Sequence, residues 1–447
     1  MTQIMKIEKI WVNKLFGFLN HQMDLKEEGV TFIHGPNGCG KTTILKMVAS
    51  FFSWQEVGTL FEINFGELVI IYDNKDEIRV TKLIKGNENN ENDDSQFPVL
   101  NITLKKESGE IESFEISTKQ AIKVPLDEVD DEIPFLTRVS LREWVDMRND
   151  EHLSYAEVLK KFAGKLGRFE TSPEWLQEYQ ESNHVCFIPA QRLFKLDSEA
   201  FPHRSRLLGE KETIQLYSDE LKNSISNTLT EFAAISQSRD RSFPDRLLSA
   251  TTPINLSDKD IKDKYKKMEN KISKLMNAGL IDEEKNISLP QQKLEETEKK
   301  VLFLYLQDRE EKLKIFDALQ KKIEVLMEIV DPKLRNKRFK VNRHKGFVFE
   351  TTNGEKDFLK PTVLSSGEQN QIVLFYELIF NSKEPSLFLI DEPEISLHVE
   401  WQRQFFNDVS KVANLTHHSF LIATHSPQII GNRRDIAIGL EGGILNE

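Results

Sequence analysis

A glycine-rich segment near the start of the chain has the spacing of a phosphate-binding loop. Residues 35–43, GPNGCGKTT, fit the pattern G-x-x-x-x-G-K-[ST]. In such a loop the glycines let backbone N–H groups surround a phosphate chain, the lysine reaches the outer phosphates, and the hydroxyl after it can bind Mg²⁺. A strand is expected before the loop and a helix after it, which is the required context. The predicted nucleotide-binding residues are Gly35, Asn37, Gly38, Cys39, Gly40, Lys41, Thr42 and Thr43.

Two acidic residues follow an apolar run near the other end of the chain. The segment SLFLIDEPE, residues 386–394, places Asp391 and Glu392 at the end of an expected strand. Asp391 would hold Mg²⁺, directly or through water, and Glu392 would polarise the attacking water. Two acids at the end of a strand more often cap a helix or lie in a solvated turn. The glycine loop upstream favours the catalytic interpretation here.

Two shorter segments have weaker signals. LSSGEQNQ, residues 364–371, offers N–H groups and a hydroxyl to an anion at the start of a helix. Taken alone, the segment favours the alternative of an ordinary helix N-cap with Glu368 at the start of the helix. In ATHSP, residues 423–427, His425 follows an apolar run and could contact a terminal phosphate, whereas a lone histidine there is more often structural. The order of all four motifs favours the nucleotide interpretation.

The composition limits the classes of protein that fit. The chain has 447 residues with 60 Lys plus Arg and 72 Asp plus Glu, a net charge of −12 that argues against coating nucleic acid along the whole surface and leaves room for a local basic patch. A chain of this length and apolar content can bury a sizeable core, which excludes disorder as its main state. Without a membrane-spanning run or a signal-peptide pattern, and with only Cys39 and Cys186, a cytoplasmic protein with no membrane partner is expected.

The hydrophobic patterns predict mixed elements along the chain. Short β-branched runs over residues 60–125 indicate an antiparallel meander, interrupted by an acidic exposed stretch at 86–96. A second acidic cluster at 127–132 is expected on the surface. Residues 141–181 and 198–248 have helical patterns, and the segment HVCFIPAQ between them, residues 184–191, indicates a buried strand. The apolar runs SLFLIDEP and SFLIATHSP are typical of central parallel strands.

The most regular pattern lies between residues 258 and 332. Apolar residues of a first arm recur at steps of four and three, and a second arm continues the pattern from residue 302 to 330 after a turn at 277–290. Two heptad arms joined by a turn predict an antiparallel coiled-coil hairpin. The alternative is two long helices packed on a core. The first arm is defined by Ile261, Tyr265, Met268, Ile272 and Leu275.

The order of the four motifs resembles the ABC-type ATPases of the SMC, RecF and OLD kind. GPNGCGKTT looks like their Walker A motif, LSSGEQ like their signature, and EISLH, residues 394–398, like their D-loop. VCFIPAQR is similar to a Q-loop strand, which nominates Gln191 for sensing Mg²⁺ and water. The resemblance implies ATP and Mg²⁺ as cofactors, with Lys41 and Thr42 on both, Asp391 on Mg²⁺, Glu392 as the base and His425 on the terminal phosphate.

The same resemblance implies a composite site between subunits. In this family two heads enclose two ATP molecules, so ATP binding drives dimerisation and hydrolysis reverses it. A homo-oligomer built from such dimers is therefore expected, with Ser366 and Gly367 acting on the nucleotide of a neighbouring subunit. The predicted signature residues that bind nucleotide are Ser365, Ser366, Gly367 and Glu368.

The resemblance also sets the expected fold. It is an α/β fold, an ABC-type ATPase head with a parallel core sheet, an antiparallel β subdomain, a helical subdomain and an inserted antiparallel coiled-coil hairpin. The N-terminal part of the head is expected over 1–190 and the helical subdomain over 191–257. The hairpin is expected over 258–332, and the C-terminal part of the head over 333–447.

The expected biological role follows from what the chain leaves out. Only 22 residues follow His425, too few for the Toprim nuclease domain of OLD proteins. A stand-alone ATPase of this layout resembles the ATPase subunits of bacterial anti-phage systems, such as the PARIS ATPase (AriA) and the Septu ATPase (PtuA). The resemblance implies a sensor and scaffold that holds and releases a separate nuclease effector, Toprim-like or HNH, with a phage-encoded trigger protein as a further partner.

The alternative is a DNA-repair or chromosome-associated ATPase of the RecF type. Its support is the segment 333–345, which contains seven Lys or Arg residues and no acid. Such a run can neutralise nucleic-acid phosphates. It can equally be a charged hairpin edge that faces solvent.

Overall fold

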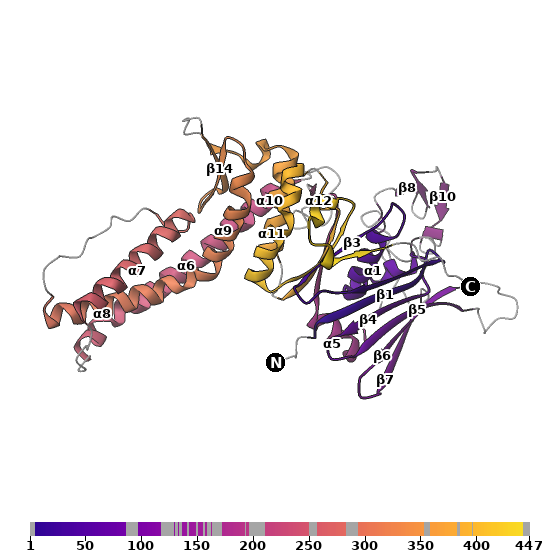
Figure 1. The fold of residues 1–447 in the computed structure, drawn as a ribbon, viewed down its shortest axis with the longest axis horizontal. Coiled ribbons are helices and arrows are strands. Elements are labelled where there is room, and N and C mark those ends of the chain that lie inside the picture. The colour runs from indigo at the N-terminus through magenta and orange to yellow at the C-terminus, as the bar shows by residue number, and fades with distance from the viewer. Residues whose placement is uncertain are drawn as a thin grey trace. The chain divides into compact units, whose positions relative to one another are not determined.

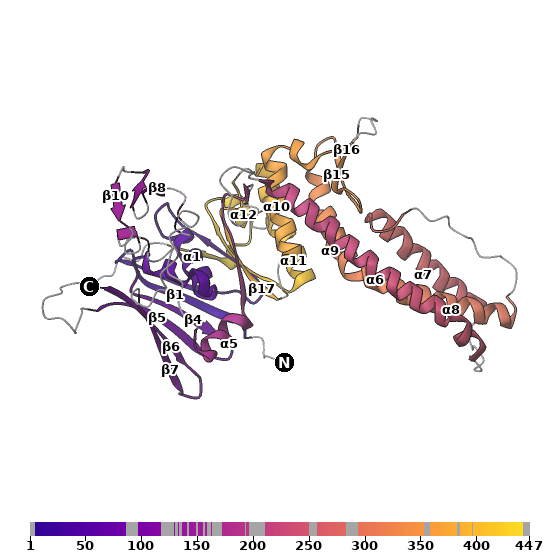
Figure 2. The same cartoon turned by 180° about the vertical axis from the view of Figure 1, so that it is seen from behind.

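The computed structural model divides the chain into two compact units. It describes residues 5–85, 97–117, short stretches between 129 and 162, 172–192, 194–195, 211–249, 257–282, 294–352, 358–381, 385–395 and 397–440. The first unit joins residues 1–190 with 382–447, and the second contains residues 191–381. Figures 1 and 2 show the elements of each unit from two sides. The segment 333–381, expected with the C-terminal part of the head, therefore lies with the helical unit.

An antiparallel sheet forms one layer of the first unit. Its strand order is β2-β1-β4-β5-β6-β7, and every neighbouring pair is antiparallel, as the meander pattern predicts. The turn at Gly17, with φ +90°, joins the first two strands. The acidic stretch at 86–96 lies outside the described residues. The strands are β1 (Ile7–Leu15), β2 (Leu19–Asp24), β4 (Glu67–Tyr72), β5 (Glu77–Lys85), β6 (Phe97–Lys105) and β7 (Ile111–Ser117).

A parallel sheet forms the second layer and brings distant segments together. Its order is β11-β17-β18-β3-β19, and all four neighbouring pairs are parallel. The continuous apolar runs predicted as central strands are confirmed, because every residue of β17 is buried. The carboxyl ends of all five strands share one edge. The strands are β3 (Val30–His34), β11 (His184–Ile188), β17 (Ser386–Asp391), β18 (Ser419–Thr424) and β19 (Ala437–Gly439).

Helix α1 (Lys41–Phe52) lies between the two sheets. Its apolar side chains share one buried cluster with residues of β1 and β4 on one side and of β17 and β18 on the other. Helix α11 (Val399–Thr416) covers the other face of the parallel sheet, where Phe406 packs against Phe32 with ring centroids 6.4 Å apart. The remaining helical elements of this unit are η1 (Trp54–Phe61), α5 (Glu174–Ser182), α12 (Pro427–Ile430) and η6 (Arg434–Ile436).

The helical prediction for residues 141–181 is wrong over its first part. Residues 136–154 form a small antiparallel sheet of β8 (Leu136–Ser140), β9 (Glu143–Asp146) and β10 (Glu151–Ser154). The segment SLREWVDM has apolar residues at helical spacing, yet burial alternates along β9, with Trp144 and Asp146 both fully buried. Packing of Trp144 against its own small cluster overrides the local pattern. Most of residues 155–171 lie outside the described part of the chain.

Long helices dominate the second unit, and their pairing differs from the predicted hairpin. The antiparallel pair is α6 (Thr213–Ser249) with α8 (Glu296–Leu313), because Asp240 contacts Lys312 at 2.6 Å while Phe232 packs on Phe316. Helix α7 (Asp258–Asn277) runs parallel to α8.

Two ion pairs fix the direction of α7. Asp258 at its start contacts Lys299 of α8 at 3.0 Å. Lys271 near its end contacts Asp317, just after α8, at 2.7 Å. Residue numbers therefore rise in the same direction along α7 and along its neighbour. The insertion of long helices is confirmed, but the predicted antiparallel pairing of the arm 258–277 is wrong, because the antiparallel partner of α8 is α6. A heptad pattern identifies the buried face of a helix and not its partner.

The rest of the second unit forms a base beneath these helices. The chain continues through η3 (Lys314–Phe316), α9 (Asp317–Val330), η4 (Asp331–Lys333), the sheet β14-β15-β16 and η5 (Pro361–Val363) to α10 (Ser366–Phe380). Strands β14 and β15 pair as an antiparallel β-hairpin. Stacked rings of Tyr217, Tyr376 and Phe380 join α6 to α10. The base strands are β14 (Lys337–Asn342), β15 (Gly346–Thr351) and β16 (Phe358–Leu359), and the two-residue strands β12 (Phe194–Lys195) and β13 (Lys211–Glu212) pair before α6.

No helix in the described parts of the chain combines the length and apolar character needed to cross a membrane.

Candidate nucleotide site

The glycine loop after β3 adopts a conformation that requires glycine. Gly38 and Gly40 have φ of +83° and +91°, in the left-handed region that L side chains rarely enter. A Cβ on Gly40 would lie 2.4 Å from Leu15 Cδ2, and one on Gly35 would lie 2.7 Å from the backbone oxygen of Leu440. Gly40 is also the N-cap of α1, so the loop leads directly into the N-terminus of a helix. Such an N-terminus favours an anion.

Lys41 is held inside this loop. Its side chain is buried, and its ammonium donates to the backbone oxygens of Gly35 at 2.9 Å and Pro36 at 3.1 Å. Cys39 Sγ lies 3.7 Å from the same nitrogen. The ammonium is therefore fixed within the curve of the loop, the position that an outer phosphate requires of it.

Thr42 and Asp391 meet although they lie far apart in the sequence. The Thr42 hydroxyl is 2.9 Å and 3.0 Å from the two carboxylate oxygens of Asp391. Burial raises the pKa of Asp391, the hydrogen bond from Thr42 lowers it, and the charge of nearby Glu394 adds to the increase. The predicted pair of magnesium ligands is thus assembled within one unit.

These residues fit a magnesium ion. A hydroxyl and a carboxylate are hard oxygen ligands, and Mg²⁺ is usually held by one or two protein groups together with phosphates and water. Among the described residues no group of three or more His, Cys, Asp or Glu could hold a metal, so the site does not offer an all-protein cage. Glu394 Oε2 is buried with no hydrogen-bond partner among the described residues, and a cation nearby would offset the repulsion between the two carboxylates.

Glu392 and His425 follow the ends of neighbouring strands and face each other. Glu392 Oε1 lies 3.5 Å from His425 Nε2, and both side chains are about one-third exposed. The φ of Glu392 is +43°, and its N–H donates to the backbone oxygen of Ala423 at 2.9 Å, which locks this unusual conformation. Strained backbone of this kind is concentrated at functional sites.

Glu394 has a role that the sequence did not reveal. Its Oε1 accepts hydrogen bonds from the backbone N–H groups of His425 at 2.6 Å and Ser426 at 3.1 Å. The carboxylate therefore fixes the turn that carries His425. The signal in the sequence was the position of Glu394, three residues after Asp391 and at the start of the segment that resembles a D-loop.

Gln191 follows the sheet edge that carries the site. It is exposed and lies three residues beyond the carboxyl end of β11, whose neighbour β17 ends in Asp391. It is also the first residue of the second unit. Its predicted contact with Mg²⁺ and water stays a prediction.

The signature segment forms the N-terminus of α10. Ser365 is the N-cap, and Glu368 completes a capping box, so the helix-cap alternative is confirmed for these two residues. Burial alone would raise the pKa of Glu368, but hydrogen bonds from Lys337, at 2.8 Å, and from Ser365 lower it. Ser365 and Ser366 are exposed, so the cap leaves both hydroxyl-bearing residues at the surface.

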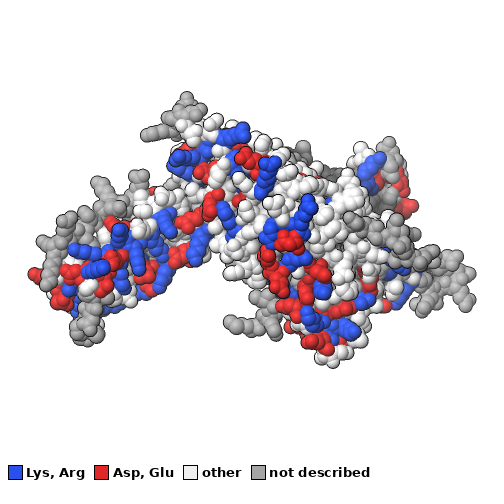
Figure 3. Space-filling view, viewed as in Figure 1, with Lys and Arg blue, Asp and Glu red and all other residues white. Residues whose placement is uncertain are grey.

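The basic run at 333–345 is largely occupied by contacts within the unit. Lys337 pairs with Glu368, Lys340 Nζ lies 2.7 Å from Glu350, and Arg343 lies 2.5 Å from Asp282. Acidic and basic side chains lie side by side around β14 in Figure 3. Three of the seven basic residues in the run are therefore paired with acids, which favours the charged hairpin edge over a nucleic-acid surface.

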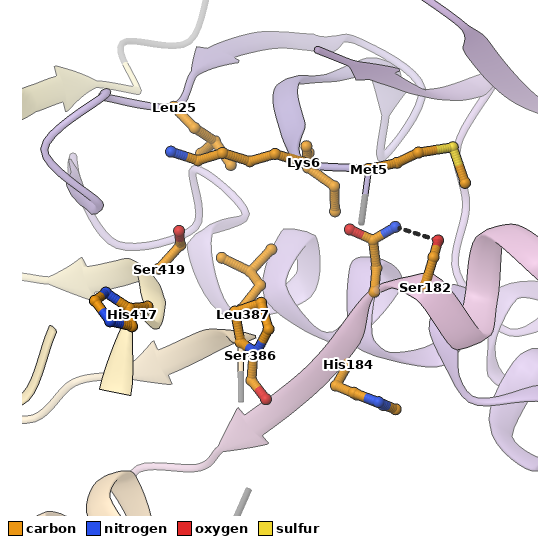
Figure 4. Close-up of a pocket in the computed structure, with 12 residues that line it drawn as sticks. Met5, Lys6, Leu25, Ser182, His184, Ser386, Leu387, His417 and Ser419 are labelled. Carbon is orange, nitrogen blue, oxygen red and sulfur yellow. Dashed lines mark hydrogen bonds between the residues drawn. The ribbon is translucent and has the colours of Figure 1, made fainter. Parts of the chain in front are cut away.

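A second pocket lies at the opposite edge of the parallel sheet. It encloses about 250 Å³ at the amino ends of β11, β17 and β18, as Figure 4 shows. Leu25 and Leu387 contribute apolar walls, and Lys6, His184 and His417 lie around them. It shares no lining residue with the glycine loop, so it is separate from the nucleotide site.

Comparisons with known proteins found one family model and several solved structures that this chain is similar to. The family model described as the AAA ATPase domain matches residues 5–430. No curated protein matches the chain. Three similar solved structures are an SMC head bound to the C-terminal winged-helix domain of ScpA, an SMC head with an extended coiled coil bound to the C-terminal domain of ScpA from Pyrococcus furiosus, and an SMC head from Thermotoga maritima.

The similarity to these structures is distant. Their identities are 11%, 14% and 11%, with TM-scores of 0.35, 0.34 and 0.30. The alignments cover 97%, 98% and 97% of this chain and 93%, 95% and 94% of the other chains.

Proposed function

We propose that this chain, which belongs to the AAA ATPase domain family, is a nucleotide-driven switch that works between two copies of itself. The family binds and hydrolyses ATP. The main structural support for placing the ATP site here is the contact between Thr42 and Asp391 at the carboxyl edge of the parallel sheet. This contact joins the glycine loop to the acidic strand end. Those two segments are the parts that an ATPase of this kind needs at one place.

Each site residue at the carboxyl edge of the parallel sheet has a specific role in this proposal. Lys41 neutralises the outer phosphates, while the Thr42 hydroxyl and the Asp391 carboxylate hold Mg²⁺. The ion, when bound, supplies charge stabilisation for the phosphates during transfer. Glu392 accepts a proton from the attacking water, and His425 donates to the terminal phosphate. Glu394 keeps His425 in place through its backbone.

The surroundings of Glu392 support its proposed role as the proton acceptor. Its carboxylate is about one-third exposed, so water can reach it, and it faces His425 across 3.5 Å. The strained φ of Glu392 aims the side chain from a fixed backbone. Among the described residues, no lysine or arginine forms a salt bridge with Glu392. Its carboxylate can therefore accept a proton as a general base.

The signature residues complete the site of a neighbouring copy. Ser366 and Gly367 open α10 at the surface, where N–H groups and a hydroxyl can face an anion. ATP bound to one copy would then contact Ser366 of the next, so that ATP stabilises the assembled form by binding it preferentially.

The long helices offer a way to pass this event to a partner. Helix α10, which begins at the signature, packs through Tyr376 on Tyr217 of α6, and α6 extends for 37 residues along the insertion. A shift of α10 on nucleotide binding would therefore move α6 as well. We propose that the insertion holds a separate nuclease effector and releases it in response to a phage-encoded trigger, as in the anti-phage ATPases that the motifs resemble.

Loss of nucleotide binding tests the ATPase assignment. Lys41→Ala should abolish ATP binding, because the loop loses the charge that neutralises the outer phosphates. Equilibrium binding of a fluorescent ATP analogue measures this directly. Retained tight binding would contradict the role of Lys41.

Co-purification tests the scaffold role. The tagged Glu392→Gln protein, expressed with its genomic neighbours, should retain a nuclease subunit that mass spectrometry identifies. A form shortened within α6–α8 provides the matched control and should lose that subunit while keeping ATP turnover. Recovery of the ATPase alone in every nucleotide state would count against the scaffold.

A further inference from the structure

A pocket of about 440 Å³ adjoins the glycine loop within the first unit. It lies at the carboxyl ends of the neighbouring strands β3 and β18, and Ala437, the first residue of β19, also lines it. The side chains that could bind a ligand there belong to His34, His425, Ser426 and Arg434. His34 and Arg434 have no part in the ATPase mechanism described above.

Two residues, Gly35 and His425, belong both to the pocket and to the nucleotide site. Gly35 lines the pocket, and its backbone oxygen accepts from the Lys41 ammonium at 2.9 Å. His425 also lines it, while its Nε2 faces Glu392 across 3.5 Å. The pocket therefore lies directly beside two residues of the proposed nucleotide site.

The charge of the lining favours an anion. The lining residues include one arginine and two histidines and no carboxylate, in a chain whose net charge is −12. An arginine guanidinium with no acid beside it is a strong, fork-shaped donor for phosphate oxygens.

Two adjacent arginines in this region differ sharply. Arg433 is bound to Asp435 at 2.7 Å and Glu28 at 2.6 Å, and it lies over the Phe406 ring. Arg434 lines the pocket, and its guanidinium makes no hydrogen bond or ion pair with the part of the chain that the structure describes. Arg433 therefore forms ion pairs within the unit, whereas the guanidinium of Arg434 is available to bind a ligand.

We propose that this pocket is an anion subsite that receives the inorganic phosphate formed by ATP hydrolysis. The subsite rests on the proposed catalytic roles. In the reaction the water oxygen bonds to the terminal phosphorus, the bond from that phosphorus to the bridging oxygen breaks, and ADP keeps the bridging oxygen with its electron pair. Phosphate then moves past His425 to Arg434 and His34, while ADP stays in the glycine loop.

Phosphate binding in the presence of ADP tests the subsite. Radiolabelled inorganic phosphate is dialysed to equilibrium against protein saturated with Mg²⁺ and ADP, so the loop is already occupied. Arg434→Gln should weaken phosphate binding about tenfold, the loss expected for one charge-assisted contact, and Arg434→Lys should restore part of it. Arg433→Gln, the matched control, should change it less than about twofold.

Steady-state kinetics separate the subsite from the ATP site. Arg434→Gln should weaken inhibition of ATP turnover by added phosphate by a similar factor, while KM for ATP stays within about twofold. A general loss of structure would instead change KM and the phosphate effect together. A second arm with a non-hydrolysable ATP analogue in place of ADP should block phosphate binding if the terminal phosphate of ATP reaches the same pocket.

Several outcomes would overturn the subsite. Equal phosphate affinity in the wild type and Arg434→Gln, an equal loss in Arg433→Gln, or no phosphate binding beside ADP would each contradict it while ATP turnover still supports the proposed function. A wild type that binds phosphate through Arg434 but turns over no ATP would support an anion site and contradict its hydrolytic origin.

Discussion

Thr42 and Asp391 are separated by 349 positions, yet their side chains lie within hydrogen-bond distance. At the scale of single residues, this contact and the enclosed ammonium of Lys41 define the chemistry of the molecule. The sequence was sufficient to nominate both, because the spacing of the glycine loop is specific. It could not reveal Glu394 as the residue that holds the His425 turn, since that role depends on hydrogen bonds between segments 31 positions apart.

Removal of the Thr42 hydroxyl should reduce turnover strongly. Thr42→Ala deletes one predicted Mg²⁺ ligand and the hydrogen bond to Asp391, so kcat should fall by about a hundredfold or more, comparable to the loss of one electrostatic contact to the transition state. Thr42→Ser keeps the hydroxyl and should retain most activity. ATP turnover as a function of magnesium concentration measures both, and equal activity of the two variants would contradict the ligand role.

The two left-handed glycines of the loop should differ in their tolerance of alanine. Gly38→Ala introduces only the conformational cost of a positive φ, about 1–2 kcal/mol, because a Cβ there meets nothing within 4 Å. Gly40→Ala adds a clash with the buried Leu15 side chain and should cost about 1–3 kcal/mol more. Thermal unfolding of both variants with the wild type gives the order, and equal melting temperatures would contradict this packing.

At the scale of elements, two findings correct expectations from local pattern. Residues 143–146 and 151–154 form two paired strands in place of a helix, because Trp144 is buried in a small core with residues on both sides of it between 129 and 162. Helix α7 pairs with α8 in parallel because the heptad pattern specifies an apolar face but not the direction of its partner. Both errors arise from tertiary contacts that no short window of sequence contains.

The direction of α7 can be measured without any substitution. Carbodiimide joins a carboxylate to a lysine only where the two already touch, so the structure predicts cross-links between Asp258 and Lys299 and between Lys271 and Asp317. Mass spectrometry of the digested protein identifies them. Cross-links from Lys271 or Lys274 to the first turn of α8 would instead support an antiparallel α7–α8 hairpin.

The Glu368 cap should stabilise the second unit in a pH-dependent way. Its pKa is lower in the folded chain than its ordinary value of 4.5, so its contribution to stability is complete above that value and is lost as the pH falls through the folded pKa. Glu368→Gln should lower the free energy of unfolding by about 1–3 kcal/mol at neutral pH.

The deficit of Glu368→Gln should shrink as the pH falls below 4.5 and through the lowered folded pKa, because the wild-type carboxylate then loses its charge as well. Denaturant unfolding at several pH values measures this difference. Ser365→Ala serves as a control that removes both hydrogen bonds of the Ser365 hydroxyl with Glu368 while leaving the ion pair with Lys337. A deficit that stays constant across this range would contradict the ionised cap.

At the scale of the whole molecule, the chain is a split ATPase unit with a helical unit between its two halves. The sequence allowed this layout to be predicted because its motifs lie at the two ends, and the parallel order β17-β18-β3 then explains how those ends meet. The assembly between copies depends on surfaces that belong to different chains, so no single sequence contains it as a pattern. The exposed signature at the start of α10 is where that assembly should be tested.

The central claim is that Glu392 activates water at a site closed by a second copy. The decisive measurement is ATP turnover and particle mass of Glu392→Gln, beside the wild type, with Mg²⁺ and ATP. The account predicts that the variant binds ATP with unchanged affinity, loses turnover by about a hundredfold or more, and accumulates as a closed oligomer that the wild type forms only transiently. Full turnover by Glu392→Gln, or a particle mass that ATP leaves unchanged, would contradict it.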